Sequence, residues 1–268
     1  MKRLYLLCFT LVVFYFSCKI NVLSGKKQMI LIPEAVLQSM ASEEYQSFLT
    51  ENKVITSTKS VGVQLVNRVS VKVIDAVKKY YQDAGLADHL NGFNWEVNLV
   101  DDSTANAWCM PGGKIVVHTG LLPISKNDAG LAVIIGHEVS HALLKHGNQR
   151  MSQGILQLMG ELAVEVAVAN KPQETQDLFL GAYGIGTDLG ALLPFSRKHE
   201  LEADRYGLIF AALAGYDPQE AIPLWERMKK ASEGEESFEF LSTHPHESKR
   251  IRYFQKIMPE ALSYYKKT

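Results

Sequence analysis

Hydrophobic positions repeat at helical spacing over several long stretches of this chain. Between residues 60 and 84 they fall on one helical face, and Gly85 ends the pattern. A second helical stretch covers residues 33–52, where Ser42 before two glutamates is a candidate N-cap. The first part of the chain is therefore predicted to form long helices.

A β-like region follows these helices. WEVNLV, residues 95–100, alternates in polarity and is rich in β-branched side chains. NAWCMPGGKIVVHTGLL then predicts two strands around a turn at residues 111–113. We expect a small sheet here.

The most apolar helical pattern is AGLAVIIGHEVSHALLKHG. Asn127 and Asp128 are positioned to cap its start, and we expect it to end at Gly147. Its first half is apolar nearly all round, which predicts a central, buried helix. Such a helix can hold a site rigidly.

Helical patterns also dominate the C-terminal third. RKHELEADRYGLIFAALAG is predicted to be helical up to Gly215, and PQEAIPLWERMKKA begins with Pro218. A last helix is expected around residues 250–257.

Residues 151–195 are harder to interpret. They carry a helical apolar stripe and then several glycines, and their charged residues leave no uncharged run near 18 residues. This excludes a membrane span. The segment is interpreted either as an amphipathic lid or plug over a site or as ordinary helix packing.

The N-terminus has a different pattern. Lys2 and Arg3 precede an uncharged run of 15 residues, 4–18, which is shorter than the ~20 needed to cross a membrane. This indicates a secretory signal peptide over residues 1–18 better than an organellar transit peptide. Residues 19–32 mix polar and basic side chains and are interpreted as a tether before a single domain, 33–268.

The run ends in Ser17-Cys18, which resembles a bacterial lipobox, although Tyr15 and Phe16 depart from the usual pattern. We expect lipid on Cys18 to anchor the protein to a membrane. The alternatives are a plain cleaved signal and an uncleaved anchor.

Composition narrows the class of protein. The chain has 268 residues, 47% of them hydrophobic and 21% charged, which is typical of a globular protein. A formal net charge of −1 gives no indication of a nucleic-acid partner. With Cys8 and Cys18 in the signal region, Cys109 alone cannot form an internal disulfide.

GHEVSH, residues 136–141, carries the main candidate chemistry. His137 and His141 are four residues apart and share a helical face, so their imidazoles can bind zinc together. Glu138 would be the base that activates a water held by the metal. The motif is short enough to occur by chance.

A third ligand is expected on another helix, and HELEAD offers one. Glu200 and Asp204 are also four residues apart. Glu200 can donate a carboxylate oxygen to zinc, and Asp204 can accept the spare N–H of a ligand histidine. Three protein ligands leave a position for water, which is typical of a catalytic zinc site.

Several motifs in order now suggest a family. HEVSH, ELEAD 59 residues after it, NAWCMPGGKIVVHTGLL, AGYDP and STHP together resemble the zinc metalloendopeptidases related to HtpX and the CAAX prenyl proteases. The soluble periplasmic branch that includes BepA, with the mitochondrial Oma-type proteases, is the most similar. The resemblance covers about residues 60–258.

The resemblance implies a fold and a metal site. The fold would be α+β and mainly α-helical, a zincin-type domain with a small mixed β-sheet packed beside the HExxH helix. One Zn²⁺ per chain would be bound by His137, His141 and Glu200, with Glu138 as base and Asp204 behind the ligands. BepA-type enzymes carry a C-terminal helical-repeat domain, and because this chain ends at Thr268 we expect partners to bind the catalytic domain.

His244, in STHP, and Arg250 are further catalytic candidates. The family histidine can lie close to the metal, so His244 would be either a self-inhibiting plug or a donor to the tetrahedral oxyanion. Arg250 is a second candidate donor. Alternatively, His244 belongs to a turn and Arg250 pairs with a surface carboxylate.

Asn106 and Ala107 are candidate substrate-binding residues. If the strand from Asn106 to Met110 is an exposed edge, an extended peptide can pair with it. A buried core strand is the alternative. The other histidines carry weaker evidence for a role: His89, His118, His146, His199 and His246.

The leading hypothesis is an exported, lipid-anchored zinc endopeptidase in protein quality control. It would act on misfolded or unassembled envelope polypeptides from the periplasmic side, at the outer membrane rather than the inner. One alternative is a non-proteolytic, chaperone-like or binding lipoprotein that zinc stabilises. A zinc enzyme acting on a small molecule has no motif in its favour.

Overall fold

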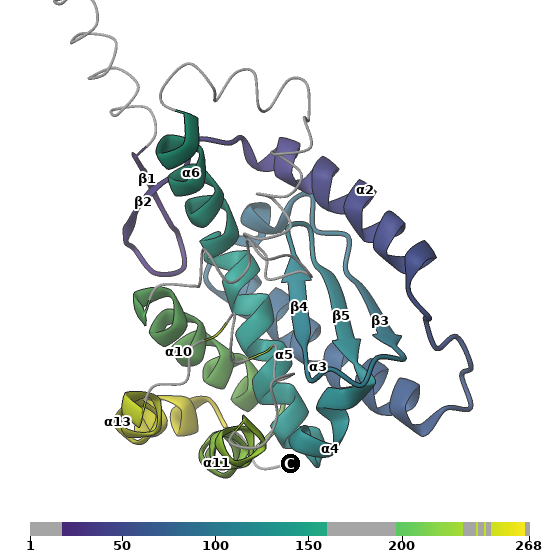
Figure 1. Ribbon diagram of the computed structural model, residues 1–268. Coiled ribbons are helices and arrows are strands. Elements are labelled where there is room, and N and C mark those ends of the chain that lie inside the picture. The colour runs from purple at the N-terminus through teal and green to yellow at the C-terminus, as the bar shows by residue number, and fades with distance from the viewer. Residues whose placement is uncertain (1–17, 160–196, 233–239, 241–243, 245–247, 266–268) are drawn as a thin grey trace, which may run out of the picture.

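The computed structural model describes residues 18–159, 197–232, 240, 244 and 248–265. This part of the chain is mainly helical, with two small sheets. Figure 1 shows a central helix, α5 (Asp128–Leu143), between a sheet on one side and further helices on the other. The architecture is α+β, as the sequence predicts.

The larger sheet contains three strands in the order β3-β5-β4. Strand β3 (Glu96–Val100) is parallel to β5 (Lys114–His118), and β4 (Ala107–Met110) is antiparallel to β5. Gly112 and Gly113 have φ angles of 77° and 82° in the turn between β4 and β5, a region that favours glycine. The predicted strands and turn are confirmed.

Helices cover both faces of this sheet (Figure 1). Trp108, Met110 and Val116 face α2 (Glu34–Glu51), whereas the alternate residues Cys109 and Ile115 face α3 and α5. Helix α10 packs on α5, and α13 packs on α10. Besides α2, the described residues form the α-helices α3 (Val61–Asp83), α4 (Leu122–Ser125), α5 (Asp128–Leu143), α6 (His146–Met159), α10 (Arg197–Leu213), α11 (Ala221–Ser232) and α13 (Ser248–Tyr264). They also form the short 3₁₀ helices η1 (Ala87–Leu90), η2 (Thr119–Leu121) and η3 (Pro218–Glu220).

Helix α5 is buried from Gly130 to Leu143, as its apolar pattern predicts. The Asn127 side chain caps it by accepting a hydrogen bond from Gly130 N at 2.7 Å. The helix ends at Leu143 rather than at Gly147, because Lys145 has a φ of 57° and redirects the backbone. A separate helix, α6, then begins at His146.

The expectation of a tether over residues 19–32 is wrong. Strands β1 (Cys18–Ile20) and β2 (Lys27–Met29) form an antiparallel hairpin. Asn21 donates to Leu143 O at 3.2 Å, and Gln28 donates to Leu144 O at 2.7 Å. The hairpin is ordered because its amides satisfy carbonyls that the end of α5 leaves without helical partners.

The prediction that Ser42 is a helix N-cap is also wrong. Ser42 lies inside α2, and Pro33 occupies the N-cap position. The helix runs through Ser42 because Leu37, Met40 and Tyr45 continue one buried face on both sides of it.

Two sequence expectations fall largely outside the described residues. The signal run before Cys18 lies there, and so does the candidate lid or plug beyond Met159. Among the helices described, none combines the length and the hydrophobicity that crossing a membrane requires.

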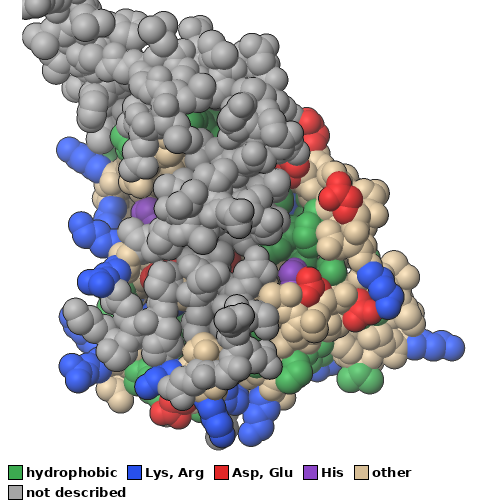
Figure 2. Space-filling model, viewed as in Figure 1, with side chains coloured by type: hydrophobic (Ala, Val, Ile, Leu, Met, Phe, Trp, Pro, Cys, Tyr) green, Lys and Arg blue, Asp and Glu red, His purple; other side chains and the backbone are tan. Residues whose placement is uncertain are grey.

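In Figure 2, lysines and arginines gather along the side of the molecule that α10 and α13 form in Figure 1.

Candidate metal centre

The candidate centre lies where α5 crosses α10. Gly136 and Gly207 meet at this crossing, and a Cβ on Gly136 would lie 2.6 Å from Gly207 O. Only the absence of side chains lets the two backbones approach this closely. The crossing brings His137 and His141 of α5 next to Glu200 of α10.

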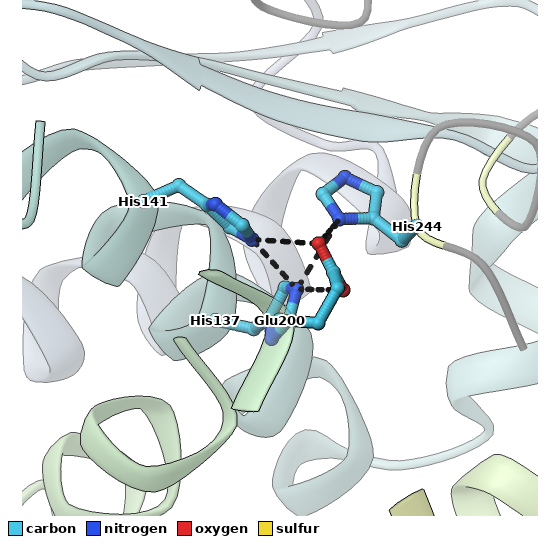
Figure 3. Close-up of side chains that lie close together, drawn as sticks. All are labelled: His137, His141, Glu200 and His244. Atoms are coloured by element: carbon cyan, nitrogen blue, oxygen red, sulfur yellow. Dashed lines mark hydrogen bonds and ion pairs between the residues drawn. The ribbon is translucent and has the colours of Figure 1, made fainter. Parts of the chain in front are cut away.

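Four buried side chains converge at this point: His137, His141, Glu200 and His244 (Figure 3). Their donor atoms all lie within 4.8 Å of one another. His137 Nε2 lies 3.0 Å from His141 Nε2 and 3.3 Å from His244 Nδ1. Glu200 Oε1 lies 3.1 Å from His244 Nδ1 and 3.4 Å from His141 Nε2.

This donor set fits zinc. Tetrahedral zinc with bonds of about 2.0–2.2 Å to nitrogen and oxygen places neighbouring donor atoms about 3.3–3.6 Å apart. Five of the six donor pairs are separated by 3.0 to 3.4 Å, and the sixth, His141–His244, lies within 4.8 Å. Three imidazoles and one carboxylate are also ligand types that zinc accepts. A cation is the simplest occupant for lone pairs that converge from four sides.

Asp204 lies behind His137, on the side away from the other donors. Its Oδ1 is 3.1 Å from His137 Nδ1, the nitrogen that faces away from the cluster. A carboxylate there favours a proton on Nδ1, which leaves Nε2 as a lone pair directed at the other donors. This contact is the one that a residue orienting a ligand histidine would make.

The pKa values of His137 and Glu200 are shifted by the charged groups that surround them. Burial by itself would lower the pKa of His137, but the hydrogen bonds to Asp204 and Glu200 raise that pKa to about 9. Burial would raise the pKa of Glu200, but His244 and Arg250 hold that pKa well below its usual range. The site therefore attracts positive charge, either a proton or a metal cation.

Glu138 is buried beside the four donors without joining them. Its Oε1 accepts no hydrogen bond from the described residues, but it forms an ion pair with His244 Nε2 at 3.5 Å. Burial raises the pKa of Glu138 above its usual value. A buried carboxylate oxygen that accepts no hydrogen bond is costly, and its place beside the four donors makes Glu138 a candidate base.

His244 reaches the cluster from the chain between α11 and α13. Its ring stacks on Phe240 with centroids 4.8 Å apart, and its backbone N–H donates to Phe240 O at 2.9 Å. Phe240 in turn donates its N–H to Ala105 O, just before β4. These contacts hold the His244 ring with Nδ1 among the donors.

Arg250 of α13 is fully enclosed behind the cluster, so its partners are not surface carboxylates. Its Nε donates to Asp204 Oδ2 at 2.9 Å, Nη2 also donates to Asp204, and Nη1 donates to Glu200 Oε2 at 2.9 Å. The guanidinium lies 4.2 Å from the centre of the Trp225 ring. Arg250 thus joins the two carboxylates that hold the site.

Asn106 and Ala107 lie at the start of β4, which is an edge strand of the described sheet. Both are buried, and Ala107 N donates to the Asn106 side chain at 2.8 Å. Asn106 O accepts from His118 N at 3.0 Å. Their proposed part in substrate binding remains a prediction.

Two histidines that carried little sequence evidence lie against the site. His146 Nδ1 is 3.0 Å from His141 Nδ1, and His199 stacks on His146 with ring centroids 4.2 Å apart. His118 lies apart from the cluster near Asp102, His89 lies on η1, and His246 is outside the described residues. The position of His146 could not be read from helical spacing, because a turn separates it from α5.

Comparison with known proteins agrees with this geometry. The profile of peptidase family M48 matches residues 68–258. The mitochondrial metalloendopeptidase OMA1 of Saccharomyces cerevisiae is 30% identical over 91% of this chain and 70% of its own length. OMA1 of Arabidopsis thaliana is 38% identical over 70% of this chain and 37% of its own length.

A bacterial relative extends the comparison. The β-barrel assembly-enhancing protease of Escherichia coli is 30% identical over 57% of this chain, which spans 32% of that protein. Most of this chain is therefore matched, although it spans only about a third of some of these relatives. The chain belongs to peptidase family M48 and is a metallopeptidase, like the metalloendopeptidases among its relatives.

Proposed function

We propose that this metallopeptidase is a zinc-dependent endopeptidase that binds one Zn²⁺ per chain. His137, His141, Glu200 and His244 would hold the ion. The observation that carries this proposal is the convergence of four buried donor atoms directly beside Glu138.

Glu138 is the proposed general base. A bound zinc ion supplies Lewis acidity, which polarises a peptide carbonyl and makes water at the site more acidic. Glu138 takes the proton of the attacking water and passes it to the leaving amine. Burial raises the pKa of Glu138, which makes its carboxylate a stronger base, and its Oε1, which accepts no hydrogen bond from the described residues, can accept that proton.

His244 is proposed as a plug that keeps the resting site closed. Its Nδ1 occupies the fourth donor position, which a catalytic zinc site otherwise leaves to water or substrate. Displacing His244 would open that position. The alternative role, donation to the oxyanion, requires the ring to turn away from the donors.

Arg250 is proposed as a positioning residue rather than the oxyanion donor. Its hydrogen bonds go to Asp204 and Glu200, so it orients two carboxylates that serve the metal. A guanidinium held by two buried carboxylates is poorly placed to turn toward a substrate.

Polypeptides are the proposed substrates, and an extended chain would pair with β4 near Asn106 and Ala107. The edge position of β4 supports this mode of binding. The hydrogen bond from Phe240 N to Ala105 O, just before β4, also supports it, because Phe240 stacks on His244.

The proposed setting is the bacterial cell envelope, in the soluble periplasmic, BepA-like and Oma-like branch of the HtpX and CAAX-protease relatives. The protein would be exported, anchored by lipid on Cys18, and active at the periplasmic side of the outer membrane on misfolded or unassembled proteins. The names of the mitochondrial relatives and of the β-barrel assembly-enhancing protease support a membrane-associated setting. No nucleic-acid partner is proposed, in keeping with the net charge of −1.

The alternative is a chaperone-like or binding lipoprotein in which zinc only stabilises the fold. The buried carboxylate of Glu138, whose Oε1 accepts no hydrogen bond from the described residues, argues against it. A purely structural site has no use for a buried base beside the metal.

The first test measures zinc content and casein cleavage by the full chain in detergent. Chelation should abolish cleavage, and Glu138→Gln should lower it by about 10²–10⁴-fold while retaining zinc, because only the base is lost. Absence of zinc from the folded protein would contradict the proposed site.

The plug is tested with His244→Ala in the same assay. We expect faster basal cleavage, because the fourth position becomes accessible. Abolished cleavage would assign His244 to the oxyanion instead, and an unchanged rate would contradict both roles. Zinc that raises the melting temperature, with no cleavage by either protein, would favour the binding lipoprotein.

A further inference from the structure

His141 Nδ1, the ring nitrogen that faces away from the cluster of donors, begins a line of polar contacts through three further side chains. His141 Nδ1 lies 3.0 Å from His146 Nδ1, and His146 Nε2 lies 3.1 Å from Glu202 Oε2. The other oxygen of Glu202 forms an ion pair with Lys26 of the N-terminal hairpin. His146 is completely buried, whereas the Lys26 side chain is 63% exposed, so the line runs from the metal centre to solvent.

The proton positions along this line follow from its end. A Glu202 carboxylate can only accept, so the neutral ring of His146 carries its proton on Nε2. His146 Nδ1 then carries a lone pair and accepts a hydrogen bond that His141 Nδ1–H donates. His141 Nε2 is therefore left as a lone pair that points at His137 Nε2 and Glu200.

The backbone places His146 for this contact. Helix α5 ends at Leu143, Lys145 adopts a φ of 57°, and α6 starts at His146. Had α5 continued, His146 would lie about 500° around the axis from His141, or about 140° away from it. The turn brings the two rings together, with centroids 4.9 Å apart.

Packing on both sides holds this arrangement. The His199 ring stacks on His146 with an interplanar angle of 16°. Asn21 and Gln28 of the hairpin donate hydrogen bonds to the carbonyls of Leu143 and Leu144, which lead into the turn.

We propose that His146 and Glu202 are positioning residues that hold His141 in the tautomer and orientation required for binding the metal. Lys26 links Glu202, at the outer end of the relay His141–His146–Glu202–Lys26, to the hairpin. The proposal rests on the zinc site proposed above and concerns residues that do not bind the metal themselves.

The test compares His146→Leu with His146→Asn in the full chain. Zinc affinity is measured by competition with a chelator, beside the cobalt absorption spectrum and casein cleavage. We expect His146→Leu to lower zinc affinity by about 10–100-fold. His146→Asn should recover much of this loss, because its Oδ1 can take the place of Nδ1 as acceptor.

His118→Leu is the matched control, because His118 is also buried but lies outside the cluster. It should leave zinc affinity unchanged. Equal affinities for His146→Leu and wild type would overturn the proposal, and so would a loss of equal size in His146→Asn. Wild type that binds no zinc would instead contradict the proposed function.

A measurement on wild type avoids variants that fail to fold. Long-range ¹H–¹⁵N NMR should find His146 protonated on Nε2 and His141 protonated on Nδ1 in the zinc-loaded protein. The reverse tautomer at either ring would overturn the relay.

Discussion

The two histidines of GHEVSH are supported by different means. Behind His137 stands Asp204, which Arg250 holds, and all three side chains are almost fully buried. Behind His141 stands His146, then Glu202, and finally Lys26 at the surface. The support of His137 is short and buried, whereas the support of His141 contains one additional imidazole and ends at an exposed lysine.

The difference teaches where the site is vulnerable. Removing one member of a buried ion pair leaves an uncompensated charge in a low-dielectric interior, which is strongly destabilising. An exposed pair has water as a substitute partner and contributes little. The His137 support should therefore govern both stability and metal binding, whereas the outer end of the His141 support should only refine them.

Loss of the enclosed arginine should have the largest effect. Arg250→Leu leaves Asp204 and Glu200 without their shared cation, and we expect the free energy of unfolding to fall by about 3–5 kcal/mol. Chemical denaturation of the metal-free protein measures this change.

The matched control for that experiment is Arg205→Leu, which breaks a partly exposed pair with Glu260. It should cost no more than about 1 kcal/mol. Similar losses for the two variants would mean that burial does not distinguish these ion pairs.

Neutralising the carboxylate in each support should have an intermediate effect. Asp204→Asn removes the charge in direct contact with His137, and zinc affinity should fall by about 10–100-fold. Glu202→Gln removes a charge that acts through the His146 ring, so its effect should be smaller, below about 10-fold. Chelator competition on both variants compares the supports directly, and a larger loss in Glu202→Gln would reverse their order.

The smallest effect is expected at the surface. Lys26→Met keeps the apolar stem of the side chain but removes its pairing with Glu202, and the free energy of unfolding should fall by less than about 1 kcal/mol. Urea denaturation at low and high salt measures it, because screening should remove most of the difference. A salt-independent loss of several kcal/mol would show that the relay is enclosed along its whole length.

Local pattern accounts for much of what the sequence predicts correctly. The strands around residues 111–113 and the buried helix α5 depend on periodicities of two and 3.6 residues. The same helical spacing suggests the candidate pairs His137/His141 and Glu200/Asp204, whose roles stay predictions. The failures are local as well: a serine before glutamates was expected to cap a helix at Ser42, and no local feature marked the break at Lys145.

The sequence by itself determined the chemistry of this protein: which side chains can bind a metal, which glutamate can act as a base, and that each candidate pair shares a helical face. Only the tertiary structure decided which residues support the two histidines of GHEVSH from behind. Arg250 meets Asp204, Lys26 meets Glu202, and the hairpin meets the end of α5 through contacts between residues far apart in the chain. Such contacts depend on which buried charges and carbonyls need partners once the helices have packed, and local periodicity carries no information about that.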